Sequence, residues 1–323
     1  MRRPVAIGVA AIVVAVLSAG CGLGTDRGQR LTLAALSTSQ PRLSQSPASP
    51  SGPTCRNPTA SLRPPAALPG PGALPAGSFM AAIRQRGYLI AGVDQNTLLF
   101  AYFNPLDGKL EGFEIDVLRE LSQAIFGNPN RIQFRAVTTA ERIPSVRSGS
   151  VDLVADAVTI TCQRRRQVDF STVYYDAGQR ILVPKDSRVR AVGDLVGKRV
   201  CATSGSTSLD NVKRLVPRAI PYPVAQRTDC LVALQQGQVD AVTSDDSILL
   251  GLKAQDPNTK IVGSSFSQQP YGIAISKSHP DFVRFINGVL ARMRSDGRWR
   301  SIYSRWLGRF TATPPPPRAT YSG

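Results

Sequence analysis

The feature that most restricts the fold of this chain is a regular alternation of strand-like and helix-like segments between residues 79 and 310. Short apolar runs such as YLIAGVD at 88–94 and VDAVTSD at 239–245 are typical of buried strands. GFEIDVLRELSQAIFG at 112–127 has the apolar spacing of an amphipathic helix that ends at glycine. Strands that alternate with helices usually pair in parallel, with helices on both faces of the sheet. The sequence therefore predicts an α/β fold.

The charge and the histidine count exclude several functions. The 323 residues carry a formal net charge of +17, which is compatible with nucleic acid, an anionic membrane surface or an anionic ligand. The basic residues are scattered and show no zinc spacing, leucine-zipper pattern or aromatic-basic RNA signature, so nucleic acid is disfavoured. A Ser-His-Asp triad or a histidine-rich metal site would have to use His279, the single histidine, which is expected in an exposed turn. We expect no metal and no cofactor.

The N-terminus has the layout of an export signal. A basic start is followed by an almost unbroken apolar run from Val5 to Ala19 that is too short for a comfortable membrane span. The small residues directly before Cys21 resemble a bacterial lipobox, with Ser18 where leucine is usual. We therefore expect residues 1–20 to be a signal peptide and Cys21 to be lipidated, which would anchor the protein to the outer face of the cell membrane. A simple cleaved secretion signal is the alternative, and both predict an exported protein.

Two segments lack the composition of a folded core. Residues 21–78 are rich in Ser, Pro, Gly, Thr and Ala, and we expect a lipid-anchored flexible tether. Residues 311–323, TATPPPPRATYSG, are expected to be a flexible tail. An exported protein reaches an oxidising compartment, so we expect disulfides among the other cysteines. Cys55, Cys162, Cys201 and Cys230 form an even set with three possible pairings.

Five stretches together resemble the polar amino-acid branch of the substrate-binding proteins that serve ABC importers. They cover roughly 230 residues in the order of that family, so the resemblance is specific although each stretch alone is weak. They are GFEIDV at 112–117, TITCQRRRQVDFSTVYY at 159–175, GKRVCATSGSTS at 197–208, GQVDAVTSDDSIL at 237–249, and YGIAISK at 271–277 with the SDGRW…YSRWLG ending.

The resemblance implies a two-lobed periplasmic-binding-protein fold, in which each lobe is a mainly parallel sheet flanked by helices and two crossing strands join the lobes. Lobe one is expected at 79–181 and 270–310, and lobe two at 182–269. The crossings are expected near 180–184 and 268–273.

The resemblance also bears on the cysteines. Some glutamate-type members have both cysteines of the Cys201–Cys230 pair, so we expect that bridge. Cys55 and Cys162 would then pair with each other, with free buried thiols as the alternative.

The family pattern assigns the α-carboxylate site to Arg164, because a guanidinium meets a carboxylate with two parallel hydrogen bonds and stays charged when desolvated. Its neighbours Arg165 and Arg166 are expected to be solvated. The turn with Gly205, Ser206 and Thr207 opens a helix, so its backbone N–H groups would face the same anion. Ordinary helix capping is a compatible interpretation of this turn.

Asp245 matches the carboxylate that receives the α-ammonium in the family, and Thr159 with the backbone of Ala157 would complete the shell. Glu114 is interpreted as a helix-start residue. Arg142 matches the arginine that meets a distal carboxylate in glutamate- and aspartate-type members, so an acidic ligand is favoured, with Asn and Gln left open. Asp94 on the opposite wall would repel a distal carboxylate unless it pairs with Arg142 or with the ammonium group of the ligand.

The resemblance implies a non-catalytic, monomeric receptor that closes on an amino acid and delivers it to a membrane permease. Two alternatives remain open at this point. One is a sensor that docks on a membrane signalling partner, and the other is a dehydratase-type enzyme on the same fold, for which Glu141 would be the candidate acid.

Overall fold

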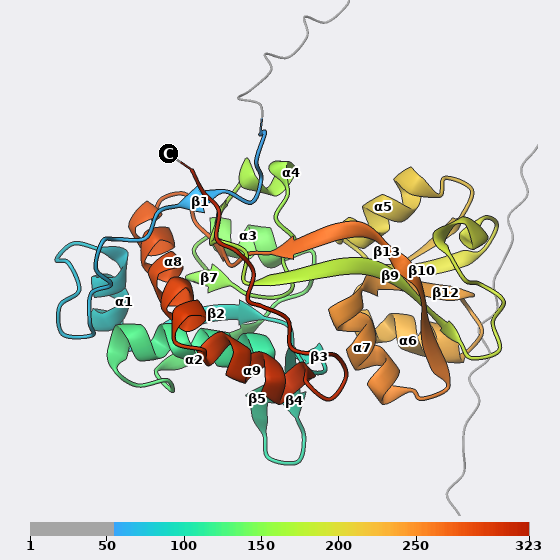
Figure 1. The fold of residues 1–323 in the computed structure, drawn as a ribbon, viewed down its shortest axis with the longest axis horizontal. Helices are drawn as coiled ribbons and strands as arrows, with labels where there is room; N and C mark the ends of the chain where they lie inside the picture. Colours follow the sequence, from blue (N-terminus) through green and yellow to red (C-terminus); the bar gives the residue numbers. More distant parts are fainter. Residues whose placement is uncertain (1–54, 323) are drawn as a thin grey trace, which may run out of the picture. The chain divides into compact units, whose positions relative to one another are not determined.

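The computed structural model describes residues 55–322. The predicted signal peptide, the lipidation site at Cys21 and the first part of the tether lie outside the described residues. Figure 1 shows two lobes joined by two long strands, β9 and β13. The two-lobed α/β fold is confirmed. Within 55–322 no helix has the length and apolar character needed to cross a membrane.

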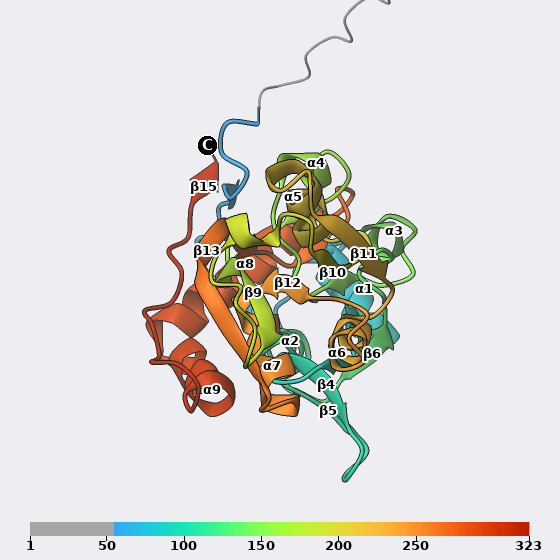
Figure 2. The same ribbon diagram turned by 90° about the vertical axis from the view of Figure 1, so that its right-hand side faces the viewer.

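Lobe one is built on a sheet with the strand order β6-β2-β7-β14-β8. β2 pairs in parallel with β6 and β7, whereas β14 runs antiparallel to β7 and β8, so the sheet is half parallel and half antiparallel. Its strands are β2 (Leu89–Val93), β6 (Ile132–Ala136), β7 (Leu153–Val154), β8 (Asp169–Phe170) and β14 (Ala274–Ile275), and a small side sheet contains β3 (Asn96–Thr97), β4 (Ala101–Asn104) and β5 (Lys109–Glu111). Its helices are α1 (Phe79–Arg86), α2 (Phe113–Phe126), α3 (Arg142–Arg147), α4 (Cys162–Arg165), α8 (Pro280–Ser295) and α9 (Arg298–Leu307). In Figure 2 the β4–β5 hairpin projects from the body.

Lobe two has the strand order β11-β10-β12-β9-β13. β10 pairs in parallel with β11 and β12, and the two crossing strands β9 and β13 complete the sheet in antiparallel pairs. Its strands are β9 (Tyr175–Pro184), β10 (Arg199–Thr203), β11 (Ile220–Val224), β12 (Ala241–Asp245) and β13 (Thr259–Tyr271). Its helices are η1 (Val192–Leu195), α5 (Thr207–Leu215), α6 (Arg227–Gln235) and α7 (Asp246–Gln255).

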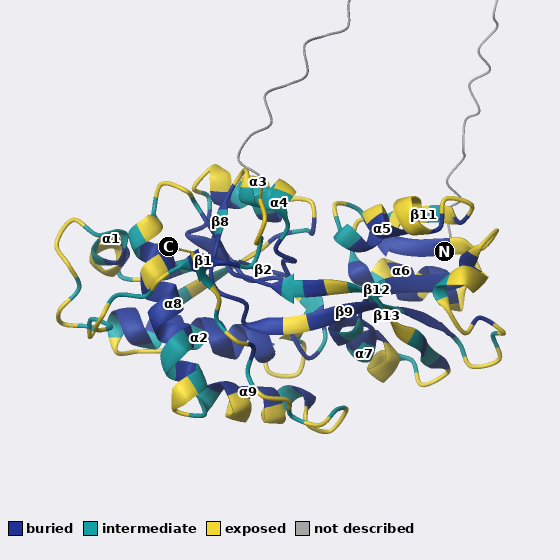
Figure 3. Cartoon of the chain, turned by 45° about the horizontal axis from the view of Figure 1, so that its top comes forward, coloured by how far each residue is buried: buried dark blue, intermediate teal, exposed yellow. Residues whose placement is uncertain are grey.

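The crossing strands leave lobe one earlier than the sequence suggested. β9 begins opposite Tyr271 at Tyr175, and from Gln179 onward it already pairs with β12 of lobe two. The first crossing therefore lies at about 175–179 instead of 180–184. Figure 3 shows the central strands of both lobes as mostly buried and the outer turns of the helices as exposed, and the edge strands β6 and β11 are only partly covered.

The segments expected to be a tether and a tail differ from the prediction where the structure describes them. β1 (Ser61–Leu62) pairs in parallel with β15 (Tyr321–Ser322), which brings the segment at 55–78 and the segment at 311–322 together beside lobe one (Figure 2). Asn287 donates to Ser61 Oγ at 2.8 Å and to Leu62 O at 2.7 Å, and Arg294 donates to Pro317 O at 2.9 Å. A segment with few apolar side chains can still be held through its backbone, and here polar side chains of lobe one donate to the carbonyls of Leu62 and Pro317.

Candidate ligand-binding site

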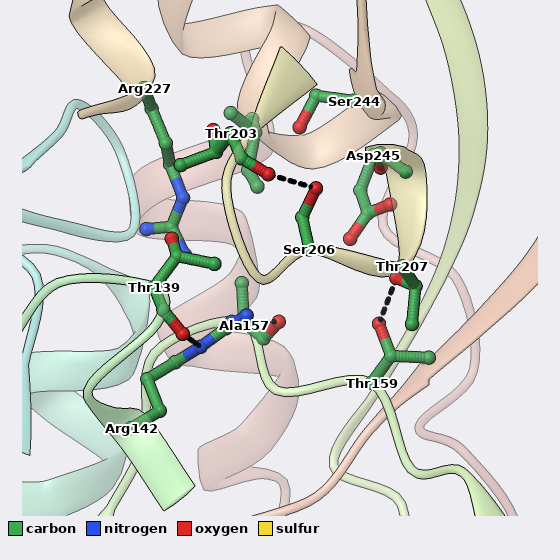
Figure 4. Close-up of a pocket in the computed structure, with 12 residues that line it drawn as sticks. Thr139, Arg142, Ala157, Thr159, Thr203, Ser206, Thr207, Arg227, Ser244 and Asp245 are labelled. Carbon is green, nitrogen blue, oxygen red and sulfur yellow. Dashed lines mark hydrogen bonds between the residues drawn. The ribbon is translucent and has the colours of Figure 1, made fainter. Parts of the chain in front are cut away.

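A pocket lies between the lobes, where loops of lobe one meet the start of α5 and the end of β12 (Figure 4). Its wall is almost entirely polar, which suits a small zwitterion better than an apolar molecule. The lining residues are Thr139, Arg142, Ala157, Thr159, Thr203, Ser206, Thr207, Ser208, Arg227, Ser244, Asp245 and Ile248.

Of the nine residues predicted to bind ligand, the structure places six in this wall: Arg142, Ala157, Thr159, Ser206, Thr207 and Asp245. Gly205, Arg164 and Asp94 lie next to it and contact lining residues or their neighbours. The other six lining residues were not predicted: Thr139, Thr203, Ser208, Arg227, Ser244 and Ile248.

The start of α5 forms the anion-facing side. The Ser206 hydroxyl caps the helix by accepting from Leu209 N at 3.1 Å, and the nine-residue helix begins at Thr207. Gly205 has φ = 75°, and a Cβ there would lie 3.0 Å from Ala140 Cα in lobe one. Only glycine lets the two lobes approach this closely without displacing backbone. The free N–H groups and the dipole of α5 favour a negatively charged group at this point.

Asp245 supplies a negative charge at the end of β12. Its carboxylate is 4% exposed, and Oδ2 accepts a hydrogen bond from the Tyr271 hydroxyl at 2.7 Å. Oδ1 has no hydrogen-bond partner among the described residues. Burial raises the pKa of Asp245 to about 6. A buried carboxylate oxygen without a donor is costly, and an ammonium group in the pocket would satisfy it.

Arg142 supplies a positive charge from the first residue of α3. It is 3% exposed, and its Nε donates to Thr139 O at 2.9 Å, while Nη1 donates to the carbonyls of Asp156 at 2.8 Å and Ala157 at 3.1 Å. Within 55–322 its one ion pair joins Nε to Asp156 Oδ2 at 3.9 Å. Arg142 thus faces the pocket, held mainly by backbone carbonyls that orient its charge without neutralising it.

The three consecutive arginines of the 159–175 motif have separate roles. Arg164 does not line the pocket wall; Nη1 donates to Thr159 O at 2.8 Å, and Nη2 reaches Gly205 O of lobe two at 3.1 Å. Burial, with the nearby charge of Arg142, lowers the pKa of Arg164 to about 9. Arg165 is not solvated as predicted, because its guanidinium donates to Pro58 O at 2.9 Å and holds the N-terminal segment. Arg166 is exposed.

Hydroxyl contacts join the lobes beside Arg164. Thr159 Oγ1 and Thr207 Oγ1, which lie 3.3 Å apart, both donate to Gln269 Oε1 on β13 at 2.8 Å. These three side chains come from lobe one, lobe two and a crossing strand, so their contact requires the lobes to be close together.

Glu114 has a larger role than a helix start. It is 1% exposed, and its Oε1 accepts from Ala157 N at 2.7 Å and from the Tyr174 hydroxyl. Ala157 has φ = 48°, a conformation that is uncommon for a residue with a Cβ, and the Glu114 carboxylate holds it there. Burial raises the pKa of Glu114 to about 7. Glu114 is therefore a positioning residue for the pocket loop.

Arg227 is the principal residue that the sequence did not reveal. It is the first residue of α6 in lobe two, and its Nη1 lies 2.6 Å from Asp94 Oδ2 and 2.7 Å from Asp156 Oδ1, both in lobe one. Asp94 therefore pairs with Arg227 of the opposite lobe, and not with Arg142 as the sequence suggested. One signal was present: a cation at the first position of a helix is disfavoured by the helix dipole, which suggests a compensating anion elsewhere.

Both predicted disulfides are present. Cys201–Cys230 joins β10 to α6, and Cys55–Cys162 joins the N-terminal segment to α4. The first bridge fixes the helix that carries Arg227 to the strand that leads into the α5 turn. It therefore ties together two parts of the pocket that belong to lobe two.

Comparison with known proteins places the chain in a family. Residues 89–309 match the model of the bacterial extracellular solute-binding proteins, family 3. The chain belongs to this family. It is 38% identical over 229 residues to the ABC transporter glutamine-binding protein of Bacillus subtilis, covering 71% of this chain and 84% of that protein.

Other relatives and solved structures agree with this assignment. The glutamate/aspartate import solute-binding protein of Salmonella typhimurium is 27% identical, covering 72% of this family 3 protein and 80% of the relative. The crystal structure of a mutant arginine-binding protein from T. maritima aligns with a TM-score of 0.67 and 30% identity, covering 71% and 99% of the two chains. An ancestral arginine-binding protein bound to glutamine aligns with a TM-score of 0.65 and 35% identity, covering 69% and 99%. These relatives are named as binding proteins, which supports a receptor role and not an enzymatic one.

Proposed function

We propose that this family 3 protein is the extracellular receptor of an ABC importer for an L-amino acid with an acidic side chain, glutamate before aspartate. Relatives named for glutamine and for glutamate/aspartate support an amino acid as the ligand class. The pocket adds an anion-facing helix end and a buried carboxylate on the same lobe, which match the two charged groups that every free amino acid carries.

The charged groups at the ligand's α-carbon would be held from both lobes. The α-ammonium lies against Asp245 Oδ1, the carboxylate oxygen that has no protein donor. The α-carboxylate lies against the N-terminus of α5. Arg164, which lies beside the pocket wall and already spans the lobes through Gly205 O, adds its positive charge from lobe one. Ligand contacts with both lobes would stabilise the closed form, as in hinge-closing binding proteins.

The preference for an acidic side chain rests on Arg142. Its guanidinium lines the pocket, is nearly fully buried and, within residues 55–322, has its one ion pair at 3.9 Å. A distal carboxylate would give this buried charge a close partner, whereas an amide would supply only a neutral acceptor. Glutamine remains the second candidate ligand, because two relatives named as glutamine-binding proteins are 38% and 39% identical to the chain.

Export and partners complete the proposal. The description of the family names its members as extracellular solute-binding proteins. The lipid on Cys21, the monomeric state and delivery to a membrane permease rest on the sequence and on the role that family members are named for.

The deciding experiment is isothermal titration calorimetry of the purified protein with the twenty amino acids, repeated on Arg142→Met. Methionine keeps much of the volume of arginine and removes the charge. We expect glutamate to bind with the highest affinity and Arg142→Met to weaken glutamate at least a hundredfold while changing glutamine less than tenfold, since a charge-assisted pair is lost only with the acid.

The matched control is Arg147→Met, which removes an exposed arginine from the same helix α3. It should leave both affinities unchanged. Equal losses for glutamate and glutamine in Arg142→Met would contradict the acidic pocket but keep the receptor. Absence of binding by any amino acid would contradict the receptor itself.

A further inference from the structure

A buried group of four charged residues extends from the pocket across the boundary between the lobes. Arg227 is 5% exposed, Asp94 is 5%, Arg142 is 3% and Asp156 is fully buried. Two guanidinium groups thus face two carboxylates, and their formal charges cancel. Buried charges are tolerated only when they are paired, so removing one member leaves a costly excess of the other sign.

The pairing within this group is uneven. The guanidinium of Arg227 lies close to both carboxylates: its Nη1 is 2.6 Å from Asp94 Oδ2 and 2.7 Å from Asp156 Oδ1. It also donates to Thr97 Oγ1 at 2.6 Å and to Asp156 O at 3.2 Å. Within 55–322 the one ion pair of Arg142 is the distant contact of 3.9 Å to Asp156 Oδ2, and its hydrogen bonds go to backbone carbonyls. Asp94 accepts a hydrogen bond from Arg227, whereas neither carboxylate oxygen of Asp156 has a hydrogen-bond partner among the described residues. The cation of lobe two therefore lies closer than Arg142 to both carboxylates that would otherwise pair with the pocket-facing cation of lobe one.

Arg227 reaches this position because of its place in the fold. It opens α6, which packs against β3 of lobe one and is bridged to β10 through Cys230. Its partners Asp94, Thr97 and Asp156 all belong to lobe one. The charge balance of the group is therefore assembled only when the lobes are together.

We propose that Arg227 is the specificity-determining residue that makes Arg142 available to an acidic ligand, and this inference rests on the proposed function. While Arg227 holds Asp94 and Asp156, the charge of Arg142 faces the pocket and attracts a distal carboxylate. Without Arg227, closure buries two carboxylates beside one guanidinium. Asp156 then pairs with Arg142, and the unpaired Asp94 repels an anionic side chain.

The test is the ratio of glutamate to glutamine affinity, measured by calorimetry on the full-length protein. In Arg227→Met we expect the preference for glutamate to fall at least tenfold, since the effect of the added negative charge is much larger on the anionic ligand. Arg227→Lys keeps the cation and should stay within about threefold of the wild-type ratio. Asp94→Asn alone leaves the group with an excess positive charge and should raise the ratio.

Two further variants complete the design. Asp94→Asn combined with Arg227→Met restores part of the balance and should recover part of the glutamate preference, a coupling that a purely structural role would not produce. Arg218→Met removes an exposed arginine of lobe two and serves as the matched control. If Arg227→Met fails to fold, as judged by circular dichroism, Asp94→Asn still decides the question: a raised ratio supports the inference and an unchanged ratio overturns it.

The outcomes separate the two proposals. Equal losses for glutamate and glutamine in Arg227→Met, with no shift in Asp94→Asn, would show that Arg227 only holds the lobes together and would overturn the inference alone. Absence of glutamate binding by the wild-type protein would overturn the inference together with the acidic pocket. Absence of binding by every amino acid would overturn the receptor function itself.

Discussion

The two lobes have similar sheets but very different cores. Lobe one has a second, mainly aliphatic cluster and a large one in which aromatic rings, two of them from the lobe-one ends of the crossing strands, pack against one another: Phe100, Phe113, Tyr174, Tyr175, Tyr271, Trp299 and Tyr303. Lobe two has two smaller aliphatic clusters, and none of the buried side chains in the described residues 179–270 is aromatic. The Cys201–Cys230 bridge belongs to one of these clusters.

This difference suggests two sources of stability. Large rings bury much apolar area per residue, so we expect them to contribute strongly to the stability of lobe one. Lobe two lacks buried rings among residues 179–270, and its bridge joins two elements of its own core and restricts its unfolded chain, whereas the bridge of lobe one holds the N-terminal segment. Both tryptophans of the chain, Trp299 and Trp306, lie in α9 of lobe one, so tryptophan fluorescence reports on lobe one, whereas far-ultraviolet circular dichroism reports on both lobes.

The largest effect is expected from removing the bridge of lobe two. Replacing Cys201 and Cys230 by alanine opens a link between residues 29 positions apart, and loop-closure entropy predicts a loss of about 3 to 4 kcal/mol. This loss of stability should affect lobe two and leave lobe one unchanged. In urea, the circular dichroism transition should move to lower concentration and separate from the fluorescence transition. Two transitions that move together would show that the lobes unfold as one unit and would contradict the comparison.

A smaller effect is expected where lobe one holds the N-terminal segment. Asn287 is fully buried, accepts from Thr172 N at 2.7 Å and donates to Ser61 Oγ and Leu62 O. Asn287→Ala leaves these buried groups without partners and should cost about 2 kcal/mol. The fluorescence transition should shift, and limited proteolysis should cleave the region before residue 79 sooner.

The control for this variant is Asn130→Ala, an exposed asparagine of lobe one. It should change neither the unfolding midpoint nor the cleavage rate. If Asn287→Ala behaved like this control, the segment at 55–78 would contribute nothing to lobe one.

The smallest effect concerns the negative charge that lobe two contributes to the pocket. The pKa of Asp245 is raised to about 6, so this carboxyl is mostly protonated at pH 5 and mostly ionised at pH 7. Since only the ionised form attracts an ammonium group, affinity for the amino acid should fall about fivefold between pH 6 and pH 5 and be nearly constant above pH 7. Calorimetry across this range measures it.

Glu114 of lobe one provides the comparison, because its pKa is raised to about 7. Glu114→Gln should weaken binding through the Ala157 loop but keep the decrease between pH 6 and pH 5. If Glu114→Gln removed that decrease, the titrating group would belong to lobe one and not to Asp245.

Much of the fold and part of the site could be predicted from the sequence. The alternation of strand-like and helix-like apolar patterns predicted the α/β fold class. The order of the motifs predicted the family and nine ligand-binding residues, of which six lie in the pocket wall. Both cysteine pairs were also as expected. The role of Arg165 and the packing of the Pro-rich ends were not predictable, because both depend on hydrogen bonds to backbone carbonyls of distant segments.

The sequence by itself determined which charges this protein carries and which motifs hold them, because local periodicity and motif order are properties of the chain. Only the tertiary structure decided which of those charges pair. Arg227 and Asp94 are separated by 133 residues and lie on different lobes, and they meet only because the crossing strands bring the lobes together. The energy of a charge pair depends on the distance between the two charges and on their burial, and neither quantity can be derived from the local sequence.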